Sequence, residues 1–146
     1  MAAPAFRLTP PEPYEADIHA ACADALDRLL KPPALWFCYP AGGTQLTAQQ
    51  AAAYSRLGLK RALPDLWFLY RGVYCVELKR HGGVLSKTQI VRTRRGSPRV
   101  LIGQEEMFPL LLASGGVRDI AIAHSVDEMF AALAAWGIPL RGRIAA

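Results

Sequence analysis

The chain has 146 residues, of which 52% are hydrophobic and 20% are charged, and its 17 Lys and Arg against 12 Asp and Glu give a formal net charge of +5. This composition excludes a disordered chain, suits one domain with a hydrophobic core, and favours a polyanionic partner such as nucleic acid. Three scattered cysteines fit neither a disulfide framework nor zinc-ligand spacing, and no apolar run approaches the ~20 residues of a membrane span.

The first part of the chain predicts an arm, a helix, a strand and a second helix. Residues 1–13 contain several prolines and are expected to form a mobile N-terminal arm, and residues 14–146 to form a single domain. Apolar residues at helical spacing predict a helix over residues 14–30, followed by a short strand over residues 35–39. Thr47 and Gln50 fit a capping box that starts a helix ending near Gly58.

The central part of the chain predicts a β-hairpin. Two β-rich runs, residues 66–70 and 73–76, are joined by a short turn that contains glycine. Asp65 opens the first strand, and Glu77 and Lys79 end the second, where strand alternation places both on one face. Two carboxylates that meet there can hold Mg²⁺, and the lysine can orient or deprotonate a metal-bound water. A solvated strand end without chemistry is the alternative.

A second hairpin, rich in cations, is predicted over residues 88–102 with its turn at residues 94–98. Polar and apolar residues alternate along its strands, and this alternation places two of the arginines on one face of the first strand. The cluster contains five cations and no acid, which favours contact with DNA phosphates over a purely solvated hairpin. The candidate DNA-binding residues are Lys87, Arg92, Arg94, Arg95 and Arg99.

The last part of the chain predicts a helix, a strand and a helix. Gln104 begins the first plausible helix after the central hairpin, although Pro109 predicts that regular helix starts near Phe108. Residues 117–123 predict a strand, and residues 126–136 predict an amphipathic helix with Ser125 as its N-cap. The whole order of elements predicts an α/β domain with a mixed central β-sheet flanked by helices and an additional basic β-hairpin.

Several of these residues carry a family resemblance. Pro64-Asp65 followed by Glu77-Leu78-Lys79 resembles the PD-(D/E)xK nuclease signature. With Gly58 before it and Gly82-Gly83-Val84-Leu85-Ser86 after it, the chain is similar to the VRR-NUC branch, the virus-type replication-repair nucleases, over roughly residues 13–140. The resemblance implies a restriction-endonuclease-like core and a Mg²⁺- or Mn²⁺-dependent DNA endonuclease. It also implies a homodimer that cleaves branched or junction DNA in replication, repair or recombination. The expected location is the cytoplasm, and the expected origin of the protein is a bacterium or a phage.

The resemblance implies roles for individual residues. Asp65 and Glu77 would hold the metal, with the backbone carbonyl of Leu78 as a third ligand. Lys79 would position the attacking water. Glu15, on the first helix, would support the site directly or through water, and its alternative role is a favourable interaction with the helix dipole.

A catalytic glutamine completes the family pattern, and two residues are candidates for it. Gln89 has the expected distance after Leu85 and Ser86 but lies in a predicted strand, whereas Gln104 begins a predicted helix. Gln104 is preferred, on the interpretation that the basic hairpin is an insertion that splits the motif. Two other functions stay open from the sequence: a DNA-binding module with a degenerate nuclease core, and a basic scaffold that binds other proteins.

Overall fold

The computed structural model describes residues 13–39, 47–92 and 94–142, so the expected N-terminal arm lies outside the described residues except for Pro13. Within them the chain forms four helices, which are α1 (Glu15–Leu29), α2 (Ala48–Arg56), α3 (Gln104–Ala113) and α4 (Val126–Ala135). It also forms six strands, which are β1 (Leu35–Cys38), β2 (Leu66–Leu69), β3 (Val73–Leu78), β4 (Gln89–Val91), β5 (Arg99–Leu101) and β6 (Val117–Ala123).

A mixed four-stranded sheet forms the centre of the fold, with strand order β1-β2-β3-β6. β1 and β3 both pair antiparallel with β2, and β6 pairs parallel with β3. A parallel pair needs a crossover between its strands, and the segment that contains the second hairpin and α3 provides it. The expectation of an α/β fold with a mixed central sheet is therefore confirmed.

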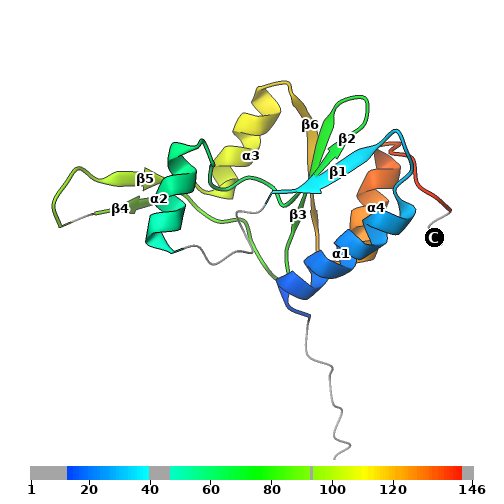
Figure 1. Cartoon of the computed structure of the whole chain (residues 1–146), viewed down its shortest axis with the longest axis horizontal. Helices are drawn as coiled ribbons and strands as arrows, with labels where there is room; N and C mark the ends of the chain where they lie inside the picture. The colour runs from blue at the N-terminus through cyan, green and yellow to red at the C-terminus, as the bar shows by residue number, and fades with distance from the viewer. Residues whose placement is uncertain (1–12, 40–46, 93, 143–146) are drawn as a thin grey trace, which may run out of the picture.

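Helices lie on both faces of this sheet. α1 and α4 pack together on one face, and α3 lies against β6 on the other (Figure 1). α1 presents a buried stripe of Ile18, Cys22 and Leu26, which recur at one helical turn. α4 begins where the Ser125 hydroxyl accepts from the Glu128 N–H at 3.1 Å, which confirms the predicted N-cap. The sheet residues that complete this core are Leu66, Phe68, Val76, Leu78 and Ala123.

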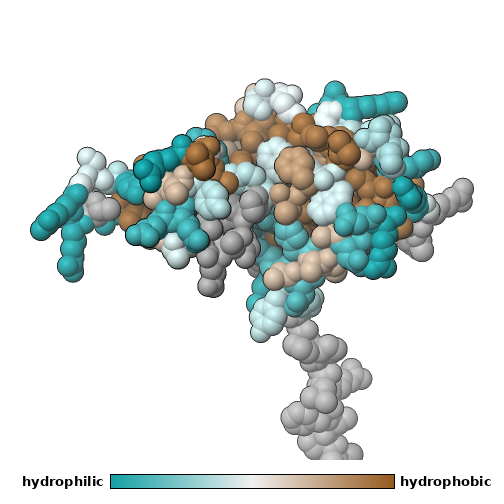
Figure 2. Space-filling view, in the orientation of Figure 1, coloured by the Kyte–Doolittle hydropathy of each residue, from teal (hydrophilic) through white to brown (hydrophobic). Residues whose placement is uncertain are grey.

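The second hairpin is a separate two-stranded ribbon. β4 and β5 pair antiparallel and project beyond α2 to one end of the molecule (Figure 1). Hydrophilic side chains gather at its tip (Figure 2). β4 ends at Val91, so Arg92 follows the strand and Arg94 lies in the turn. The expectation that both arginines share one face of a strand is wrong, because the paired ribbon is only three residues long on each side.

α3 begins earlier than predicted. It starts at Gln104 and contains Pro109, so the prediction of a start near Phe108 is wrong. Proline removes the N–H that would have bonded to the carbonyl four residues earlier, that of Glu105. Pro109 and Glu105 are both exposed, so water can satisfy that carbonyl.

No helix in the described part of the chain is both long and apolar enough to cross a membrane.

Candidate active site

The central hairpin places Asp65 opposite Glu77. β2 and β3 pair Leu66 with Val76, and extending this antiparallel register by one residue brings Asp65 to Glu77. Paired residues point to the same face of a sheet, here the face that carries α3. The backbone N–H of Leu78 donates to Asp65 Oδ2 at 2.9 Å, and the N–H of Tyr39 donates to the Asp65 carbonyl at 2.8 Å. Asp65 is therefore tied to both neighbouring strands.

Glu77 is the most unusual charged residue of this site. Its side chain is buried, with 1% of the residue exposed. One carboxylate oxygen, Oε1, lies 2.6 Å from Lys79 Nζ and 2.5 Å from Gln104 Nε2. The other oxygen, Oε2, is buried and has no hydrogen-bond partner among the described residues. An unpaired carboxylate oxygen in a protein interior is costly, so this atom is poised to take a proton or a cation.

The surroundings of Glu77 raise the pKa of its carboxyl group from 4.5 to about 7. Burial is the largest cause, because it penalises the charged form, and the neighbouring charge of Asp65 adds to it. Lys79 and Gln104 act in the opposite direction by binding the carboxylate. Two carboxylates that share a site repel each other, and Lys79 offsets this repulsion only in part, since the pKa of Glu77 stays raised.

Ser86 holds the amino end of α3 in position. Its hydroxyl accepts from the backbone N–H of Gln104 at 3.0 Å, and its carbonyl accepts from the N–H of Glu105 at 3.1 Å. Its own N–H donates to Gln104 Oε1 at 3.2 Å, which turns the other end of that amide, Nε2, toward Glu77. Ser86 thus caps a helix that begins 18 residues later and orients the side chain that contacts Glu77.

Thr88 and Gly103 complete this junction. The Thr88 hydroxyl accepts from the Gly103 N–H at 3.0 Å and donates to Glu106 Oε2 at 2.6 Å. A Cβ on Gly103 would lie 2.3 Å from the backbone carbon of Lys87 and 2.4 Å from the carbonyl oxygen of Ser86. Glycine is required here because two backbones touch. Sequence reasoning missed these contacts, and the run from Gly82 to Ser86 was the only signal that pointed to them.

Replacing Ser86 with alanine is expected to destabilise the fold by about 1 kcal/mol, because it removes the hydroxyl that accepts from the Gln104 N–H at the start of α3, while the two backbone contacts of residue 86 stay. Chemical denaturation of the variant measures the change. Ser97→Ala is the matched control, since Ser97 is exposed and forms no hydrogen bond in the described part of the chain. Equal midpoints for the two variants would show that the Ser86 hydroxyl does not support α3.

The raised pKa of Glu77 predicts a stability that depends on pH in the metal-free protein. A carboxyl group whose pKa is higher in the folded state favours folding below pH 4.5, and this contribution is lost as pH rises to about 7. The loss is on the order of 3 kcal/mol. Glu77→Gln removes the titration, so in EDTA the variant should gain stability over the parent between pH 4.5 and 8. Parallel pH profiles for the parent and Glu77→Gln would contradict this, and Glu105→Gln, at an exposed position, is the control.

The remaining candidate residues lie at different distances from this centre. Gln104 is brought to Glu77, whereas Gln89 lies exposed on β4. Glu15 is exposed in the first turn of α1, and no hydrogen bond or ion pair among the described residues joins it to Asp65 or Glu77. The five cations of the second hairpin segment are all exposed, and no hydrogen bond or ion pair among the described residues joins them to Asp65 or Glu77: Lys87, Arg92, Arg94, Arg95 and Arg99.

The site can offer a metal two carboxylates and backbone oxygens. In the described parts of the chain, no three or more His, Cys, Asp or Glu side chains are grouped so that they could hold a metal ion. Asp65 and Glu77 are therefore not joined by Glu15 or by a histidine. No protein-family model matches the chain, and neither does any curated protein or any solved structure.

Proposed function

We propose that this chain is a Mg²⁺- or Mn²⁺-dependent DNA endonuclease with a restriction-endonuclease-like core of the VRR-NUC type. The observation that carries the proposal is the environment of Glu77, a buried carboxylate that faces Asp65 and leaves one oxygen without a partner. Lys79 and Gln104 hold the other oxygen. This arrangement is expected where two carboxylates can bind a cation and a neighbouring lysine can orient a water molecule.

The residues present fit a hard divalent cation. Such ions prefer carboxylate and carbonyl oxygens, and Asp65, Glu77 and the carbonyl of Leu78 offer them. The orphaned Oε2 of Glu77 gives the site an atom whose burial is relieved by a bound cation. When bound, the ion would stabilise the charge that develops on the scissile phosphate. Glu15 would contribute through water, from its exposed position on α1.

Each side chain of the site has a distinct part in the proposed hydrolysis. Lys79, with 13% of its side chain exposed, would orient the attacking water as an ammonium that donates a hydrogen bond to it, and would take up the water's proton only after giving one of its own to solvent. Gln104 keeps Glu77 in one rotamer through its amide, and Ser86 keeps Gln104 in place. The Gln104 amide and Ser86 are neutral groups that hold Glu77 in place before substrate binds, so the site is preorganised.

The charge of the protein supports a DNA partner. The hairpin of β4 and β5 carries exposed arginines at a tip that projects from the body (Figure 2). Such an arm can follow phosphates without reading bases, which suits selection of branched or double-stranded DNA by its shape. We further propose that the protein acts as an intracellular homodimer, since junction cleavage needs two cuts.

A DNA-binding module without catalytic activity is the second candidate function. The observation that favours it is the lack of a third metal-ligating side chain beside Asp65 and Glu77 in the described part of the chain. Such a module would keep the phosphate-tracking arm and bind DNA with a steep dependence on salt. A basic scaffold for protein partners would show no such dependence.

The experiment that decides between these functions is cleavage of flap, junction and linear duplex DNA by the purified protein, with Mg²⁺, with Mn²⁺ and with excess EDTA. We expect metal-dependent cutting that favours the branched substrates. Salt-dependent DNA binding without any cutting in either metal would support the binding module instead. If the protein neither binds nor cuts DNA, a scaffold for protein partners is the remaining candidate function.

Replacing Lys79 is expected to lower turnover far more than DNA affinity. Lys79→Met should reduce cleavage by roughly 100-fold, the usual contribution of a positioned acid or base, and Lys79→Arg should restore it only in part. Loss of the cation also leaves Glu77 buried without its partner, so rates are compared well below the unfolding transition. Lys31→Met, at an exposed site, is the control. Full activity of Lys79→Arg would remove the role in proton transfer.

A further inference from the structure

The sheet face that carries the carboxylates also carries an aromatic pair that the proposed active site does not use. β1 and β2 pair Phe37 with Trp67. Two residues further along, the same register brings Tyr39 to Asp65, and β3 adds Glu77. Residues two apart on a strand share a face, so the aromatic row lies beside the carboxylate row at about 7 Å.

The two rings form a flat, oriented surface. The ring centroids of Phe37 and Trp67 are 6.1 Å apart, and the planes are inclined by only 13°. The indole N–H of Trp67 donates to the carbonyl of Pro64 at 2.9 Å, which fixes the orientation of that ring. Phe37 is 45% exposed, as α3 packs at the opposite edge of the sheet, against β6. The pair is therefore accessible and needs little ordering before a flat group stacks on it.

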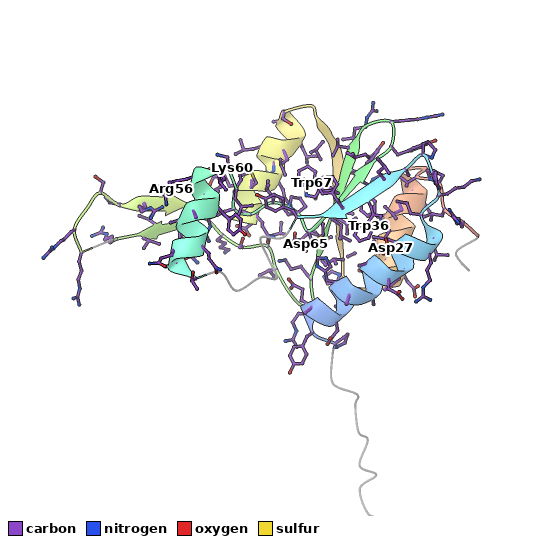
Figure 3. All side chains as sticks on the ribbon, viewed as in Figure 1. Asp27, Trp36, Arg56, Lys60, Asp65 and Trp67 are labelled. Atoms are coloured by element: carbon purple, nitrogen blue, oxygen red, sulfur yellow. The ribbon has the colours of Figure 1, made fainter. Side chains whose placement is uncertain are left out.

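The backbone of Lys60 is tied to the end of this aromatic row. The Tyr39 hydroxyl accepts from the backbone N–H of Lys60 at 2.8 Å and donates to its carbonyl at 3.1 Å. Tyr39 thereby fastens Lys60 to the strand end that also holds Asp65. Figure 3 shows Lys60, Asp65 and Trp67 in the central part of the molecule, between α2 and α1. Lys79 lies on the carboxylate side, paired with Glu77, and Lys60 is exposed, so a lysine is found on each side of the stacked rings.

We propose that Phe37 and Trp67 form a stacking platform for an unpaired DNA base next to the phosphate that is cut. Aromatic rings bordered by cations are what proteins use to bind single-stranded nucleic acid, because every base has a π-face and every nucleotide a phosphate. The inference rests on the proposed function and narrows its substrate class. The preferred DNA has at least one single-stranded nucleotide at the cut, as a flap or an open junction does, and a fully paired duplex does not.

The test compares two substrates and three variants, using the full chain in EDTA so that nothing is cut. Binding of a thymidine oligonucleotide and of a blunt duplex of equal length is measured by anisotropy, with quenching of tryptophan fluorescence as a second readout. Phe37→Leu removes the ring and keeps an apolar side chain. We expect it to weaken single-strand binding by roughly tenfold and to leave duplex binding unchanged. Phe37→Trp, which keeps a ring, should restore affinity.

Leu35→Ala is the matched control, since Leu35 lies two residues before Phe37 on the same face and is 63% exposed. It should bind both substrates as the parent does. Equal single-strand affinity for Phe37→Leu and the parent would overturn the platform while metal-dependent cleavage left the endonuclease proposal standing. If Phe37→Leu and Leu35→Ala both change the oligomeric state and neither changes DNA binding, the platform proposal is overturned, and this sheet face is instead covered by a second copy of the chain. Failure of the parent protein to bind the thymidine oligonucleotide would overturn the platform, and absence of cleavage with Mg²⁺ and with Mn²⁺ would overturn the endonuclease proposal.

Discussion

Asp65→Asn and Glu77→Gln are each expected to abolish metal-dependent DNA cleavage while the protein still folds and binds DNA. Each change removes one negative charge from the proposed metal site and keeps the shape of the side chain. Loss of a metal ligand removes several kcal/mol of transition-state stabilisation, so the rate should fall by roughly 100-fold or more. DNA affinity should hold or rise, because one source of repulsion from phosphate is gone.

Geometry makes this pair of variants informative. The Leu78 N–H donates to Asp65 Oδ2, and an asparagine oxygen can accept the same bond. Glu77→Gln also relieves the burial of a charge, so loss of activity could not be ascribed to unfolding. Gel assays of cleavage and anisotropy measurements of binding are run side by side, with Glu105→Gln as the exposed control on α3. Full activity of both variants, or cleavage by the parent in excess EDTA, would refute the proposed site.

Removing the arginines at the tip of the β4–β5 ribbon is expected to give the second large effect. The triple replacement of Arg92, Arg94 and Arg95 by alanine should weaken binding to all DNA sequences alike. Each phosphate contact on duplex DNA contributes a slope of about 0.9 to the plot of log affinity against log salt, so the slope should flatten by roughly two to three units. Thermal stability should barely change, because exposed charges contribute little to it.

A charge-matched control separates local contact from net charge. Replacing Arg28, Arg118 and Arg141 by alanine removes the same total charge from exposed sites elsewhere on the surface. This second triple variant should keep nearly the parent slope. If both triple variants lower affinity and slope equally, the protein attracts DNA by overall charge and the ribbon is no arm. If neither does, a protein interface becomes the better account of the arginine cluster.

The sequence predicts the carboxylate pair because the contact is local. One tight turn links β2 to β3, and a short hairpin fixes its register, so Asp65 and Glu77 could be placed face to face from spacing alone. The caps at Thr47 and Ser125 were equally accessible, since each bonds three residues along the chain. In these cases side-chain chemistry and chain geometry act within one element.

The sequence favours Gln104 over Gln89 but does not decide between them, because the choice depends on the path of a long connection. Gln104 reaches Glu77 across 27 residues, after the ribbon has folded away from the sheet. The start of α3 was mispredicted for a related reason. Pro109 is a strong local signal, but the cap that Ser86 supplies from 18 residues away allows the helix to begin earlier.

α2 has a consequence for how the molecule moves. None of the nine described residues of this helix is buried, and Leu57 just after it is 83% exposed. A helix so short is marginal without tertiary packing, and here its capping box and backbone bonds are its main support. The amide hydrogens of α2 should therefore exchange with solvent through local fraying, whereas those of β3 should exchange only when the whole protein unfolds. The chain thus has two tiers of stability, a rigid sheet that holds the carboxylates and a loosely held flank that can reshape itself around whatever the sheet binds.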